Sequence, residues 1–171
     1  QYVFRCASCD RVTAPTVLGA ASVVNWADEG RTLFDRSVAL FPNTMRKIRG
    51  GLDLHAVRGM AVPFIVELRG GGSHSRAITD PLSTITAKGN HHGLLVPPGW
   101  NPVTGLGSVP VADLDLSRCR YRILKPTELK HGTAFTDDYV LLGTGDQQRT
   151  MVGNAVTPPA ARVIGSAVVE A

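Results

Sequence analysis

The apolar segments of this chain are short, and glycine or proline ends each of them. Val62–Leu68 predicts a buried strand that stops at the flexible stretch 70–73, and Gly93–Val96 predicts another that stops at Pro97. Between them, Thr84–Ala87 has the alternating pattern of a β-segment. We therefore expect short strands joined by loops. No apolar run approaches the ~18 residues that a membrane-spanning helix needs.

Three other segments carry helix signals. Pro42–Leu54 predicts a short helix with a basic flank and a glycine stop at Gly50–Gly51. Pro126, with Glu128 two residues later, favours the start of a second short helix. Thr157–Val169 begins with a threonine cap and a proline, which predicts a terminal helix. Its apolar face needs a sheet or another helix to cover it and consists of Ala160, Val163, Ile164, Ala167 and Val168.

The charge balance is mildly basic, with a net charge of +4 and eight of the 18 Lys and Arg residues before residue 60. This balance fits a phosphate-bearing partner, and it equally fits an ordinary solvated surface. Cys6, Cys9 and Cys119, with no signal-peptide pattern at Gln1, indicate a reducing compartment, and we expect the cytoplasm. The spacing of Cys6 and Cys9 suits half of a zinc site, but no second pair follows. A turn holding two reduced thiols is the alternative.

Three segments, in a fixed order, resemble motifs of the DNA cytosine-5 methyltransferases. Arg-Ile-Leu-Lys-Pro-Thr-Glu at 122–128, followed by Phe-Thr-Asp-Asp-Tyr at 135–139, resembles the ninth of that family's ten motifs. Gly-Asn-Ala-Val-Thr-Pro-Pro-Ala-Ala-Arg at 153–162 resembles the tenth. Asp-Pro-Leu-Ser-Thr-Ile-Thr-Ala at 80–87 is similar to the threonine-rich strand of the target-recognition region, which precedes the ninth motif. One departure is Ala-Phe-Thr at 134–136, where the family usually has Gly-Phe-Pro.

The resemblance implies an α+β fold for this chain. The expected architecture is a small, loop-rich β recognition domain with short helices and a C-terminal helix. In complete members that helix packs on a Rossmann-like α/β catalytic domain. We expect a Cys-containing, loop-rich segment with a basic helix at 1–60, a target-recognition region at 61–118, and the ninth and tenth motifs at 119–171. The resemblance is to bacterial and phage members, among them those of restriction-modification systems.

The chemistry of the family requires residues that this chain lacks. A cysteine of a Pro-Cys pair attacks C6 of a flipped-out cytosine, and a glutamate of a Glu-Asn-Val stretch assists at N3. The methyl group then passes from S-adenosylmethionine to C5. Here Arg5, Ser8 and Arg118 precede the three cysteines, and no Glu-Asn-Val occurs. The resemblance thus implies part of a DNA cytosine-5 methyltransferase with no catalytic residue of its own, inactive without an upstream catalytic half.

Two groups of contact residues follow from the resemblance. Asn154, Ala155 and Val156 match the part of the tenth motif that lines the S-adenosylmethionine pocket, and the alternative for Asn154 is a cap on the terminal helix. Thr84, and after it Thr86, match the strand that hydrogen-bonds the DNA backbone beside the extruded nucleotide. The alternative for both threonines is an ordinary half-buried strand.

Base contacts are expected from residues on either side of that strand. Arg76, Lys88 and Asn90 are the candidates, because such donors reach base edges in the major groove. A solvated hairpin tip is the alternative for Lys88 and Asn90, together with the neighbouring histidines. Arg122 and Glu128 of the ninth motif are expected to be structural, joined in a charge-assisted pair.

Two other functions remain open at this point. The chain fits a free-standing DNA-binding or regulatory module, and it also fits one chain of a split methyltransferase. Under all of these hypotheses the expected partner is duplex DNA, and no membrane is involved.

Overall fold

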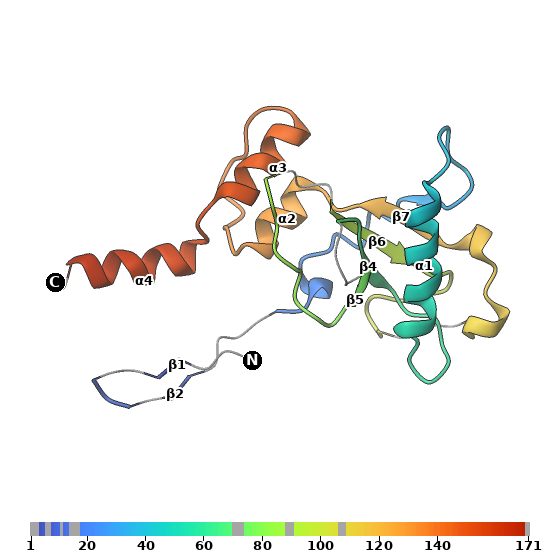
Figure 1. The fold of residues 1–171 in the computed structure, drawn as a ribbon, viewed down its shortest axis with the longest axis horizontal. Helices are drawn as coiled ribbons and strands as arrows, with labels where there is room; N and C mark the ends of the chain where they lie inside the picture. Colours follow the sequence, from blue (N-terminus) through green and yellow to red (C-terminus); the bar gives the residue numbers. More distant parts are fainter. Residues whose placement is uncertain are drawn as a thin grey trace.

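The computed structural model describes residues 4–5, 8–10, 12–13, 18–69, 74–87, 91–105 and 109–169. A five-stranded antiparallel sheet in the order β3-β7-β6-β4-β5 forms its centre (Figure 1). Its strands are β3 Arg31–Thr32, β4 Phe64–Glu67, β5 Ser75–Ala77, β6 His92–Val96 and β7 Arg120–Ile123. A separate antiparallel ribbon pairs β1 Phe4–Arg5 with β2 Val12–Thr13. The large sheet joins strands from all three sequence ranges expected above.

Four α-helices accompany the sheet: α1 Pro42–Leu54, α2 Pro126–Gly132, α3 Gly145–Asn154 and α4 Pro158–Val169. Short 3₁₀ turns lie at Ala20–Ser22, Val111–Asp113 and Leu116–Arg118. The expected α+β fold is confirmed, as are the strands around β4 and β6 and the helices α2 and α4. Among the described helices, none has the length and apolar character needed to cross a bilayer.

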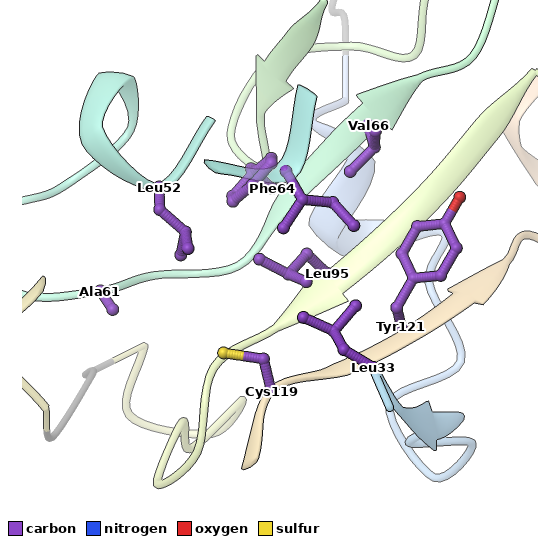
Figure 2. Close-up of a cluster of buried hydrophobic side chains, with 9 residues drawn as sticks. Leu33, Leu52, Ala61, Phe64, Val66, Leu95, Cys119 and Tyr121 are labelled. Carbon is purple, nitrogen blue, oxygen red and sulfur yellow. The ribbon is translucent and has the colours of Figure 1, made fainter. Parts of the chain in front are cut away.

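Side chains alternate across the strands, so the sheet buries a core on each face. Phe64, Leu95 and Tyr121 lie on one face and pack with Leu52 of α1 (Figure 2). Ile65 and Leu94 point to the other face. There they meet residues from the first 3₁₀ turn, α2, α3 and the connecting segments, namely Ala20, Val24, Ile78, Leu124, Leu129 and Val152. The sheet is therefore the middle layer of the molecule.

Helix α1 corrects one expectation from the sequence. Gly50–Gly51 was expected to end the helix, but α1 continues to Leu54. A Cβ atom on Gly51 would overlap the ring of Phe64, whereas one on Gly50 would meet open space. Gly51 thus lets α1 lie close against β4, and the burial of Ile48 offsets the cost of glycine within a helix, about 1 kcal/mol.

The segment Thr84–Ala87 also differs from the sequence-based expectation. We expected a β-segment there, and this prediction is wrong, because the structure has no regular strand at 81–87. The backbone there pairs with side chains instead of a neighbouring strand: Arg69 Nη1 donates to the Thr84 carbonyl at 3.0 Å, and Thr150 Oγ1 donates to the Ala87 carbonyl at 2.9 Å. These bonds hold an irregular segment in place without a ladder.

Helix α4 extends away from the body of the molecule (Figure 1). The apolar face expected from the sequence is present, but it packs against nothing in the described residues. Val163, Ile164 and Val168 are 71%, 60% and 72% exposed. A helix of this length gains most of its stability from packing, so an uncovered apolar face is an incomplete arrangement.

Candidate functional site

Segments 80–87, 122–132 and 145–156 meet on one face of the sheet, and we call this contact the motif junction. It contains 80–87, 122–128 and the start of 153–162, which carry the family resemblance, together with the rest of α2 and most of α3. A Cβ atom on Gly153 of α3 would overlap the carbonyl group of Thr86, so the backbones of the two segments touch. On the other side, a Cβ atom on Gly132 of α2 would lie 2.8 Å from the Leu82 side chain. Helices α2 and α3 also pack on each other.

The centre of the ninth-motif segment is a buried ion pair. Glu128 accepts hydrogen bonds from both terminal nitrogens of Arg122, each at 2.7 Å. Its two oxygens also accept from the backbone amides of Asn25 and Lys125 at 2.7 Å. Arg122 in turn donates to the carbonyls of Asn25 and Asp28. The charge-assisted pair expected from the sequence is present, and it ties α2 and β7 to the segment around residue 25.

A second buried polar cluster lies between β4, β5 and the segment 80–87. Glu67 is 1% exposed, and its carboxylate accepts from Arg76 Nε at 3.1 Å and lies 3.5 Å from Arg69 Nη2. Burial would raise the pKa of Glu67, but hydrogen bonds from Ser83 and Arg76, with the charge of Arg69, lower it overall. Lys47 is also buried, and its Nζ donates to the carbonyls of Glu67 and Arg69.

His92 completes this cluster. His92 on β6 lies opposite Glu67 on β4 in the register of the sheet, and its Nε2 lies 3.0 Å from Ser83 Oγ. Burial lowers the pKa of His92 to about 4, so the imidazole is neutral at pH 7. Sequence analysis singled out neither Glu67 nor Ser83. A glutamate at the end of an apolar strand was the available signal, because such a group needs cationic partners when buried.

Two cations, Arg69 and Arg76, contact the single carboxylate of Glu67 next to Thr84. Arg69, which contacts this carboxylate, also holds the Thr84 carbonyl, while the Thr84 side chain is exposed. Arg76 is engaged with Glu67 and is one third exposed. The surplus of positive charge favours an anionic group near Thr84.

The other expected DNA contacts fall in different places. Thr86 is half-buried where it meets Gly153. Lys88 and Asn90 lie outside the described residues. His91 is half-buried, and its carbonyl accepts from the amide of Leu68 at 2.8 Å. The structure therefore brings Thr84, Thr86 and Arg76 to one region of the sheet face.

The expected cofactor residues follow the end of α3. Asn154 is the last residue of α3, and Ala155 and Val156 connect it to α4. All three are exposed. Because α4 begins at Pro158, the alternative in which Asn154 caps the terminal helix is wrong. An exposed amide and an apolar side chain are thus presented beside the motif junction.

The cysteines lie away from this junction. Cys6 is outside the described residues, and Cys9 is exposed and forms no disulfide there. Cys119 is buried in the core under α1. Across the described ranges, no group of three or more His, Cys, Asp or Glu side chains is arranged to hold a metal ion.

Comparison with known proteins identified no relative: no family model, curated protein or solved structure matches this chain.

Proposed function

We propose that this chain is the DNA-recognising, carboxy-terminal portion of a DNA cytosine-5 methyltransferase. Methyl transfer from S-adenosylmethionine to C5 of cytosine in duplex DNA then requires an upstream catalytic half, which supplies the Pro-Cys nucleophile and the Glu-Asn-Val stretch. In this proposal the residues of this chain contact the DNA and form one side of the cofactor pocket.

The strongest support for this proposal is the contact between segments at the motif junction. The segments 80–87, 122–128 with 135–139, and 153–162 were selected only for their likeness to family motifs, and they are separate in the sequence. The segment that resembles the tenth motif nevertheless contacts the threonine-rich segment, at Gly153 with Thr86. Gly132 of α2, which follows the segment 122–128, lies against Leu82. Motifs that act together in one family are expected to meet in this way, whereas chance resemblances carry no such requirement.

The charge near Thr84 supports a DNA contact at the junction. A hydroxyl donates to a phosphate oxygen at a small desolvation cost, and backbone contacts of this kind position a protein on duplex DNA. Arg69 adds positive charge beside it, because its Nη1 donates to the Thr84 carbonyl. This part of the surface accordingly suits the phosphate backbone better than a base edge.

Uncovered apolar side chains favour a further polypeptide over a free-standing module. More than half of the exposed large hydrophobic residues in the described structure lie between Tyr139 and Val169. Exposed apolar surface that is concentrated in one region marks an interaction site. A catalytic half that packs on α3 and α4, in the same chain or in a partner chain, would bury it beside Asn154–Val156.

Selection from a random duplex library tests the recognition role. We expect the chain to retain duplexes in low salt and to release them as salt rises, because phosphate contacts displace counterions. Retained duplexes should share a site that contains cytosine. Retention of all sequences alike, or no retention in low salt, would contradict a recognition function.

A further inference from the structure

A partly enclosed cavity of about 450 Å³ lies beside the ends of β6 and β7. Residues 26–32, 94–102 and 117–120 contribute to its lining. This volume is within the range of small-molecule sites, roughly 300–1,000 Å³. No residue that we assign to DNA or cofactor contact lines the cavity, so it needs an explanation of its own.

Two indole rings form part of its wall. The ring centroids of Trp26 and Trp100 are 6.2 Å apart, and the ring planes are tilted by 40°. Trp26 is fixed by its Nε1, which donates to the Ala21 carbonyl at 3.0 Å. Pro98 and its neighbour Pro97 add rigid apolar surface. A wall of this kind accepts the face of a flat aromatic ring, and base-on-tryptophan stacking uses the same geometry.

The remaining lining is charged. Arg120 forms a salt bridge with Glu29 at 3.0 Å, and the two side chains are 45% and 62% exposed, so the pair is weak and can exchange partners. Arg118 forms no salt bridge in the described part of the chain. Its acidic neighbour is Asp115, whose pKa is lowered by hydrogen bonds from Ser117 and by the charge of Arg118. Guanidinium groups bind phosphate, and a carboxylate accepts a hydrogen bond from an exocyclic amino group.

We propose that this cavity binds one nucleotide unit, with its base stacked on the indole rings and its phosphate at Arg118. An amino-bearing base, cytosine or adenine, fits best because Glu29 offers an acceptor at the rim. The nucleotide is either free in solution or an unpaired residue of a longer strand. This site goes beyond the methyltransferase proposal and needs neither a duplex nor a catalytic half.

Tryptophan fluorescence reports directly on this cavity, because Trp26 and Trp100 are the only tryptophans of the chain. We expect dCMP and dAMP to change the emission saturably at millimolar concentration or below, and ribose 5-phosphate, which lacks a base, to have no such effect. Tighter binding of a short single-stranded oligonucleotide than of dCMP would identify a strand as the source of the nucleotide. The reverse order would identify the free nucleotide.

Variants assign the binding to named side chains. Trp100→Leu should weaken dCMP binding about tenfold, as loss of one stacking contact does. Trp26 remains as the fluorescent reporter in this variant. The substitution breaks no hydrogen bond of the indole, because Trp100 Nε1 has no partner among the described residues. Arg118→Ala should weaken binding of dCMP and leave that of deoxycytidine unchanged, whereas Arg49→Ala, on α1 across the sheet, should alter neither.

Absence of any saturable change with dCMP or dAMP would overturn the nucleotide site. An equal response to ribose 5-phosphate would do the same, as would wild-type binding by Trp100→Leu. Duplex retention in the library experiment is independent of these results, so failure of the nucleotide site is distinguishable from failure of the recognition role.

Discussion

Thr84 is the residue on which the proposed phosphate contact depends most. Its side chain is exposed, and its carbonyl accepts a hydrogen bond from Arg69, which anchors the backbone that carries the hydroxyl. Thr84→Val removes the donor and keeps the shape. We expect duplex binding to weaken by about 1 kcal/mol, roughly fivefold, to a similar extent for all DNA sequences.

The salt dependence should change little in this variant, because the lost contact is neutral. Fluorescence anisotropy with a labelled duplex at several salt concentrations measures both quantities. Thr104→Val, an exposed threonine outside the motif segments, is the matched control and should bind as the wild type does. Unchanged binding by Thr84→Val would leave the threonine with a structural role only.

His92 makes the stability of the fold depend on pH. Burial lowers its pKa to about 4 from an ordinary value near 6.5, so the unfolded chain takes up a proton in this interval and the folded chain does not. Stability is therefore lost as the pH falls from 6.5 towards 4. Between pH 7 and pH 5 the loss should be about 2 kcal/mol.

Urea unfolding at pH 7 and pH 5 measures this effect, and His92→Gln should remove most of it. His55, whose pKa is lowered mainly by burial, contributes in the same direction and remains in the variant. The lowered pKa of Glu67 stabilises the fold, and this contribution is lost mainly as the pH falls below about 4.5, outside the measured interval. An equal loss of stability in the wild type and in His92→Gln would contradict the account.

At the scale of elements, Gly153 determines how α3 meets the segment 80–87. A Cβ atom there would overlap the Thr86 carbonyl group, and this carbonyl belongs to backbone, which has little freedom to move. Gly153→Ala should destabilise the protein by about 1–3 kcal/mol through overpacking. It should also weaken duplex binding, because Thr84 lies on the displaced segment.

The matched control is Gly165→Ala in α4, where an added methyl group meets open space. This change should leave stability the same or raise it by up to about 1 kcal/mol, since alanine is the better helix former. Thermal unfolding of the two variants compares them. Equal stability of both would show that the motif junction is not packed as described.

Strands and helices with strong local signals were predicted well from the sequence. The apolar run at β4 and the Pro-Glu start of α2 specify their elements locally, and both are where they were expected. Helix α3 was not anticipated, because its glycines and polar residues give no apolar period. Its start is specified by Thr144 and Gln147, which cap each other's backbone amides.

Tertiary contacts explain the remaining differences. The sequence alone predicts a helix stop at Gly51, whereas the structure shows that this glycine lets α1 approach Phe64, a residue of another element. Within the candidate site, the Arg122–Glu128 pair was expected because both residues lie in the segment that resembles the ninth motif. The cluster of Glu67, Ser83 and His92 was not, because three separate segments bring it together.

At the scale of the whole molecule, the described structure divides into a packed sheet body and an uncovered end. The body buries both faces of the sheet, whereas from residue 159 onward α4 is exposed. Truncation after Thr157 should therefore leave the unfolding midpoint of the body nearly unchanged. The same truncation should prevent a catalytic half from docking, because the apolar face of α4 is the surface proposed to receive it.

Methyl transfer tests the central proposal most directly. S-adenosylmethionine with a labelled methyl group and duplex DNA are incubated with this chain alone, with an upstream polypeptide that carries the Pro-Cys and Glu-Asn-Val segments, and with both together. We predict label in C5 of cytosine only when both are present, and none when the chain is truncated after Thr157. Label transferred by this chain alone, or by the upstream polypeptide equally well without it, would contradict the account.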